Sequence, residues 1–79
     1  VEIDCLVEAV DGSLHIIEIK GGATINTDYL KHIKKFTLQE FDLHKYLFYT
    51  GKDSIAIGDV KIVGWNDISD NLSSIIDKV

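Results

Sequence analysis

The feature that most limits how this chain can fold is the sequence Asp11-Gly12-Ser13, which stands between two short hydrophobic runs. An Asp-Gly pair between such runs is a strong signal for a β-hairpin. In residues 1–10, apolar side chains alternate with mostly polar ones, which is the period of a strand that buries one face. We therefore predict that residues 1–10 and 14–20 pair as antiparallel strands.

The length of the turn decides which side chains share a face, because directly opposed residues of an antiparallel pair point the same way. A two-residue loop would set Asp4 opposite Ile19 and scatter charges over both faces. A three-residue loop sets Leu6 opposite Glu18 and Asp4 opposite Lys20. One face then consists of Ile3, Cys5, Val7, Ala9, His15, Ile17 and Ile19. A slip of one residue would turn every side chain over, so this nearly apolar face selects the three-residue turn.

The rest of the chain follows from hydrophobic spacing and turn residues. After Gly21 and Gly22, a helix is expected to begin after Asn26 or Thr27, and its apolar positions are Tyr29, Leu30, Ile33 and Phe36. Residues 45–50, 54–57 and 60–65 are expected to be strands. Asn66 is expected to cap a terminal helix whose apolar positions are Ile68, Leu72, Ile75, Ile76 and Val79.

The predicted order is therefore β-β-α-β-(β)-β-α, in which residues 54–57 are an additional short strand to a β-β-α-β-β-α core. A helix that connects residues 14–20 to residues 45–50 requires those two strands to be parallel, whereas the hairpin is antiparallel. We predict an α/β fold with a mixed sheet flanked by helices.

Composition limits the chain further. At 79 residues it is one domain, and its single cysteine, Cys5, is expected to pack as a small hydrophobe in a reducing, cytoplasmic setting. No apolar run approaches the roughly 20 residues of a membrane span. The chain begins at Val1 and contains no methionine, so we expect a fragment of a larger protein. Its net charge of −5 is unusual for a nucleic-acid binder, which must then gather positive charge locally or offset its carboxylates with metal ions.

The polar face of the predicted hairpin carries a candidate site. Asp4 and Glu18 are diagonal neighbours there, roughly 7–8 Å apart at the backbone, and two carboxylates at that spacing can share one Mg²⁺ or Mn²⁺ ion. The carbonyl of Ile19 is a third candidate metal ligand, and Glu2 an auxiliary one. Lys20 would orient or deprotonate a water molecule, or stabilise the charge of a transition state. The alternative is a solvated cross-strand ion pair between Asp4 and Lys20, which would contribute little.

Two segments carry a resemblance to a known family: E-I-D-C-L-V-E at residues 2–8 and L-H-I-I-E-I-K-G-G-A-T-I-N at residues 14–26. They resemble the core of the PD-(D/E)XK, or restriction-endonuclease-like, nuclease superfamily. More narrowly, they are similar to the C-terminal domain of prokaryotic AAA-type P-loop ATPases, as are F-Y-T-G at residues 48–51 and I-V-G-W-N-D-I at residues 62–68. The resemblance implies a restriction-endonuclease-like core, metal at Asp4 and Glu18, and a catalytic lysine at Lys20. Gly21 departs from the family pattern, in which serine is common.

Other candidates are weaker. His15, His32 and His44 match no compact metal-ligand spacing, and His15 is expected to be a core histidine with its hydrogen bonds satisfied. The nucleic-acid contacts that we predict are Gly21, Gly22, Lys31, Lys34 and Lys35, although a solvated helix face explains the three lysines equally well. Trp65 is expected in the core.

We therefore predict a metal-dependent nuclease domain that hydrolyses phosphodiester bonds in DNA, or less readily in RNA, and belongs to a larger ATPase. The alternative is an inactive module of the same fold that binds nucleic acid, oligomerises or regulates the ATPase. The expected partners are DNA, the rest of the ATPase chain and a second copy of the domain.

Overall fold

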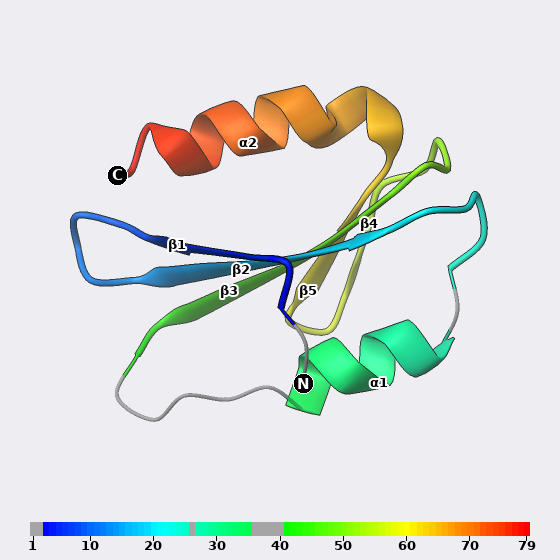
Figure 1. Cartoon of the computed structure of the whole chain (residues 1–79), viewed down its shortest axis with the longest axis horizontal. Coiled ribbons are helices and arrows are strands. Elements are labelled where there is room, and N and C mark those ends of the chain that lie inside the picture. Colours follow the sequence, from blue (N-terminus) through cyan, green and yellow to red (C-terminus); the bar gives the residue numbers. More distant parts are fainter. Residues whose placement is uncertain (1–2, 26, 36–40) are drawn as a thin grey trace.

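The computed structural model describes residues 3–25, 27–35 and 41–79 of the chain. Its elements, in order, are β1 (Cys5–Glu8), β2 (Leu14–Lys20), α1 (Thr27–Lys35), β3 (Leu43–Tyr49), β4 (Ile55–Ile57), β5 (Val60–Val63), a 3-10 turn η1 (Trp65–Asp67) and α2 (Ile68–Ile76). The strands form one sheet in the order β1-β2-β3-β5-β4. This sheet lies between the two helices, with α1 on one face and α2 on the other (Figure 1).

The sheet is mixed, as the sequence predicts. β2 pairs in parallel with β3, and β3 in parallel with β5, while β1 and β4 pair antiparallel to their neighbours at the two edges. The connection from β2 through α1 to β3 is the predicted strand–helix–strand crossover. The α/β class and the predicted order of elements are therefore confirmed.

The turn between β1 and β2 has three residues, but it begins one residue earlier than predicted. The Ala9 N–H donates to the Ser13 carbonyl at 2.9 Å, and the Gly12 N–H donates to the Ala9 carbonyl at 3.0 Å. The loop is therefore residues 10–12, not residues 11–13. Gly12 has a φ of 89°, the left-handed conformation that ends three-residue hairpin loops of this type. The side chain of Asp11 accepts hydrogen bonds from both the N–H and the hydroxyl of Ser13.

This earlier turn shifts the strand register by two residues. Leu6 lies opposite Ile16, so the predicted placement of Leu6 opposite Glu18, and of Asp4 opposite Lys20, is wrong. Side chains alternate with a period of two, so a shift of two keeps every residue on its predicted face. The prediction of which residues share a face is therefore confirmed for the residues of β1 and β2, although the pairs within it are not.

Each face of the sheet packs against one helix. On the α1 face, the buried cluster consists of Leu30, Ile33, Leu47, Tyr49, Val60 and Ile62. On the α2 face, it consists of Ile17, Tyr46, Phe48, Val63 and Ile75, with Cys5, Val7, Ile68 and Leu72 partly buried against them. The predicted helix cap at Asn26, the core position Phe36 and the auxiliary ligand Glu2 lie outside the described residues, as does the side chain of Tyr29.

The C-terminal segment differs from the prediction in three respects. Trp65 is 56% exposed instead of buried, because β5 ends at Val63 and the chain then makes the 3-10 turn η1. Asn66 lies inside that turn, and Asp67 occupies the N-cap position of α2. Ile76 and Val79 are exposed, because α2 ends at Ile76. No helix in the described ranges is long and apolar enough to cross a membrane.

His15 is fully buried on the α2 face, and its ring nitrogens have the partners predicted for a core histidine. Nδ1 lies 3.1 Å from the Tyr46 hydroxyl, and Nε2 lies 3.4 Å from the Ser13 hydroxyl. The His15 ring also stacks on His44, with 4.6 Å between the ring centroids. Burial lowers the pKa of His15 below its ordinary value of 6.5, and the neighbouring His44 lowers it further.

We expect this histidine to make stability depend on pH. The unfolded chain takes up a proton at His15 near pH 6.5, whereas the folded chain resists protonation until a lower pH. Stability from this group is therefore complete above pH 6.5 and is lost as the pH falls below that value, by up to about 1.4 kcal/mol per pH unit. Urea unfolding between pH 7.5 and 5 should show this loss, and His15→Gln should reduce it. The exposed His32→Gln is the control; equal slopes for the two variants would contradict the assignment.

Candidate functional site

Asp4 lies directly before the first residue of the edge strand β1. Its side chain is exposed, and its Oδ2 atom accepts a hydrogen bond of 2.7 Å from the Ile19 N–H. In a continuous hairpin, the backbone carbonyl of Ile3 would take this hydrogen bond, because the pairing of Cys5 with Ile17 continues to that residue. The Asp4 carboxylate therefore replaces a backbone acceptor and is held against β2.

Glu18 and Lys20 are alternate residues of β2, so they point to the same face, the one that α1 covers. Glu18 is only 8% exposed, although it carries a carboxylate. Its Oε1 atom lies 3.1 Å from the Lys20 Nζ atom, while the Lys20 side chain keeps 34% of its surface exposed. A buried carboxylate is costly without a partner, and the Lys20 ammonium provides one.

A hydrogen bond, and not the strand register, connects Asp4 with the other two residues. The pairing of β1 with β2 ends at Cys5 and Ile17, and the chain bends at Asp4. The Asp4 carboxylate accepts its hydrogen bond from the Ile19 N–H, which lies between Glu18 and Lys20 in β2. The structure thus brings Asp4 to the backbone between Glu18 and Lys20, and it brings the Glu18 carboxylate to the Lys20 ammonium.

Ile19 lies between Glu18 and Lys20 in β2, and its side chain points to the other face of the sheet, where it is 59% exposed. Its N–H points toward Asp4. In a strand, the N–H and the C=O of one residue point toward the same neighbouring strand. The Ile19 carbonyl is therefore directed to the same edge of β2 as the Asp4 carboxylate, as a third oxygen ligand would require.

The glycine loop after β2 is open on its outer side. A Cβ atom added at Gly21 or at Gly22 would have no atom within 4 Å outside the glycine and its two chain neighbours. Gly22 also has a φ of 111°, which favours glycine. The loop is fastened to the end of β3 by Thr50. The Gly22 N–H donates to Thr50 Oγ1 at 2.9 Å, and the Thr50 N–H donates to the Gly22 carbonyl at 3.1 Å. Sequence reasoning missed Thr50, because only the parallel pairing of β2 with β3 brings it to this loop.

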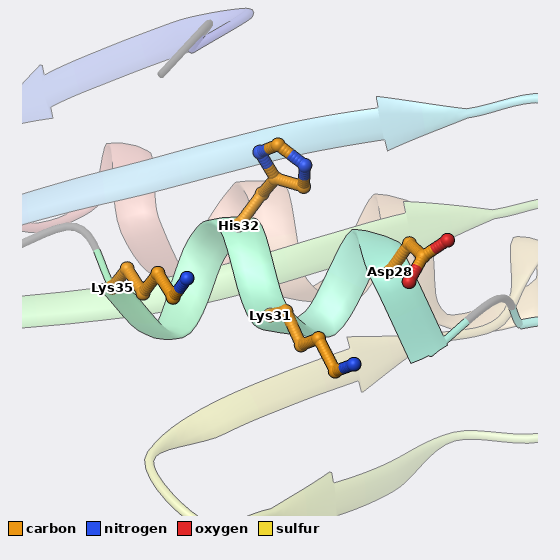
Figure 2. A pocket seen from close by; sticks show the side chains of 4 residues that line it. All are labelled: Asp28, Lys31, His32 and Lys35. Carbon is orange, nitrogen blue, oxygen red and sulfur yellow. The ribbon is translucent and has the colours of Figure 1, made fainter.

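The predicted lysines of α1 do not form one group. Lys31, Lys34 and Lys35 are all exposed. Lys34 extends over the β4–β5 turn, since a Cβ atom at Gly58 would lie 3.7 Å from its Cε atom. Lys31 and Lys35 lie on the side of the helix that faces away from the sheet, together with Asp28 and His32 (Figure 2).

Lys45 is a buried lysine whose contacts the sequence did not predict. It is 5% exposed on the α1 face of β3, and its ammonium donates to the Lys34 carbonyl at 3.1 Å and to Asp59 Oδ2 at 3.2 Å. It therefore supplies a cation to the C-terminal turn of α1, where the carbonyls of a helix carry partial negative charge.

Comparison with known proteins supplies a family. A model of the family described as "Domain of unknown function (DUF4143)" matches residues 1–68 of the chain. The chain belongs to the DUF4143 family. DUF4143 domains are found in AAA-ATPase-associated proteins. No curated protein and no solved structure matches the chain.

The donor set of this DUF4143 domain fits a hard divalent cation. Asp4 offers a carboxylate at the backbone of Ile19, Glu18 offers one from the preceding residue of β2, and the Ile19 carbonyl is directed to the same edge as Asp4. Mg²⁺ and Mn²⁺ prefer such oxygen ligands, and Mg²⁺ usually takes only one or two carboxylates from the protein. In residues 3–25, 27–35 and 41–79, no three His, Cys, Asp or Glu side chains lie together as a metal site, so the candidate site offers two carboxylates and a backbone carbonyl only. The three histidines predicted to be weak candidates are therefore not joined in one cluster.

We expect Thr50 to hold the glycine loop of the DUF4143 domain in place. Thr50→Val keeps the shape of the side chain but removes the acceptor of the Gly22 N–H, at a cost of about 0.5–1.5 kcal/mol. Amide hydrogen exchange at Gly22 should become faster, while exchange in β2 stays unchanged. Thr24→Val, in the same loop, is the control. Unchanged protection of Gly22 in Thr50→Val would show that the hydroxyl does not hold the loop.

Proposed function

We propose that this domain is a metal-dependent phosphodiesterase that cleaves nucleic acid, DNA in the first instance, as the nuclease-like part of a larger ATPase. The observation that carries the proposal is the meeting of Asp4, Glu18 and Lys20 at the end of β2, where a carboxylate that is 8% exposed contacts a lysine ammonium and Asp4 accepts a hydrogen bond from the Ile19 N–H. The order of elements, with a hairpin followed by a helical crossover to a parallel strand, agrees with a restriction-endonuclease-like core.

Asp4, Glu18 and the Ile19 carbonyl would hold the cation. A divalent ion at such a site lowers the pKa of bound water and offsets charge on a phosphoryl oxygen. Asp4 is positioned for this task by the Ile19 N–H, which occupies one of its two oxygens and leaves Oδ1 for a ligand. Glu18 is positioned by burial and by Lys20.

Lys20 is the group that would act on the substrate. Its ammonium lies 3.1 Å from Glu18, at the end of β2, and is one-third exposed. A positive charge at this place stabilises the negative charge that develops on the phosphoryl oxygens in the transition state. The same ammonium can hold the attacking water by a hydrogen bond. Gly21 and Gly22, which follow directly, leave space for the sugar–phosphate backbone to approach.

Lysines and carboxylates share the side of the sheet that α1 covers. Five of the eight lysines lie on α1 or on that sheet face: Lys20, Lys31, Lys34, Lys35 and Lys45. Glu8, Glu18 and Asp28 lie on the same side, and the ammonium groups of Lys20 and Lys45 are paired with Glu18 and Asp59. Association with a polyanion would therefore rely on the exposed lysines of α1 and on a metal ion that offsets the carboxylates of the site.

Calorimetric titration with Mn²⁺ tests the metal site. We expect the wild-type chain to bind at millimolar concentration or below, and Asp4→Ala to abolish binding because it removes one of two carboxylates. Glu8→Ala is a matched control, since Glu8 is an exposed carboxylate at the other end of β1, opposite Leu14 and away from Glu18 and Lys20. Loss of binding in the control as well, or no binding by the wild type, would argue against the site.

Nicking of supercoiled plasmid DNA in the presence of Mn²⁺ tests the chemistry. Lys20→Met should lower the rate about 100-fold, which is the effect of removing one charge-stabilising donor from an active site. Lys52→Met removes an exposed lysine from the β3–β4 turn and should leave the rate unchanged. Equal rates for the wild type and Lys20→Met would exclude a catalytic role for Lys20.

A second candidate is an inactive module of the same fold that binds nucleic acid, oligomerises or regulates the ATPase. The observation that favours it is that both carboxylates already have partners within the chain, namely the Ile19 N–H and the Lys20 ammonium. Under this alternative, the two contacts are structural. Asp4→Ala and Lys20→Met would then lower the free energy of unfolding, and neither Mn²⁺ binding nor nicking would be detected in the wild type.

A further inference from the structure

The face of α1 that points away from the sheet carries a hollow of about 150 Å³. It is lined by Asp28, Lys31, His32 and Lys35, whose spacing of three, four and seven residues places them on one side of a helix. Figure 2 shows Lys35 and Asp28 at the two ends of this row, with His32 and Lys31 leaving the helix on opposite sides. Leu30 and Ile33 lie on the other side of α1, in the core.

The hollow carries two lysine ammonium groups against one carboxylate, that of Asp28. The side chains of Lys31, His32 and Lys35 make no ion pair, hydrogen bond or ring contact with another residue in the described part of the chain. Lysines near the end of a helix often serve to offset its negative dipole. Here Lys45 already does so, because its buried ammonium donates to the Lys34 carbonyl. The lining of the hollow therefore keeps a net positive charge that an anion can offset.

The position of the hollow connects it with the candidate site. Leu47 lies beside Glu18 in the paired strands β2 and β3, and it packs in one cluster with Leu30 and Ile33 of α1. The helix thus covers the same face of the sheet that carries Glu18 and Lys20. A polyanion that reaches the candidate site can contact the outer face of α1 as well.

We propose that this hollow binds one backbone phosphate of a nucleic-acid strand, at a place separate from the cleavage site, through Lys31, Lys35 and His32. This inference rests on the proposed function for the identity of the anion. Lysine binds phosphate as a compact point charge, and the hollow offers two ammonium groups and one imidazole as donors, with Asp28 as the acidic member of its lining. Lys34, which extends toward the β4–β5 turn, is not a ligand of this phosphate.

The test is binding of a twelve-residue oligothymidylate in metal-free buffer with a chelator, which separates phosphate recognition from the metal site. The double variant Lys31→Gln/Lys35→Gln should bind roughly tenfold more weakly. For this variant, the slope of a plot of log K against the logarithm of the salt concentration should be less negative by about 1.4. The control, Lys34→Gln/Lys52→Gln, removes the same charge outside the hollow and should bind within about twofold of the wild type. Equal losses in the two double variants would overturn the proposal, because they would indicate diffuse electrostatic attraction only.

A spectroscopic measurement distinguishes direct contact. The imidazole resonances of His32 should shift on addition of the oligonucleotide in the wild type and in the Lys34 control, and should not shift in Lys31→Gln/Lys35→Gln. Oligonucleotides with and without a 5′-phosphate identify the source of the anion; equal affinity supports a backbone phosphate, whereas binding that needs the terminal phosphate overturns that assignment. Binding at the hollow without nicking would refute the proposed nuclease alone, and nicking without an effect of the hollow variants would refute this inference alone.

Discussion

Seven residue pairs join β2 to β3 in parallel, from Leu14 and Leu43 to Lys20 and Tyr49. Every other part of the molecule is positioned by this ladder. It requires the crossover that places α1 on one face, and it brings Thr50 to the glycine loop that follows β2. It also sets Leu47 beside Glu18, so that a core residue supports the buried carboxylate on one side. Parallel pairing of this kind cannot form locally, so the candidate site exists only in the folded domain.

The sequence predicted the class of the fold and the faces of its strands because both follow from periodicity. The alternation in residues 1–10 and the Asp-Gly pair were sufficient for the hairpin. The register was beyond that information, since a slip of two residues leaves every side chain on the same face. What decided it was the local chemistry of the turn, in which Gly12 takes the left-handed position at the end of the loop and Asp11 bonds to Ser13.

The same reasoning explains which parts of the site were found. Glu18 and Lys20 were predicted together because alternate residues of a strand share a face, which the register error did not change. Asp4 joins them by accepting a hydrogen bond from the Ile19 N–H, a contact that the alternation of side chains does not predict. Thr50 and Lys45 carried no local signal, because their roles depend on contacts with Gly22 and with the end of α1. Trp65 was misplaced for a related reason: its apolar character predicts burial, but the backbone leaves the sheet at Gly64 and turns its ring outward.

One hydrogen bond, from the Val10 N–H to the Lys78 carbonyl at 2.7 Å, joins the tip of the first hairpin to the segment that follows α2. It connects positions that are 68 residues apart in sequence (78 − 10). The entropy of closing so long a loop is met only after the intervening strands have assembled. Protection of the Val10 amide from hydrogen exchange therefore reports on the contact between the first hairpin and the final turn of the chain.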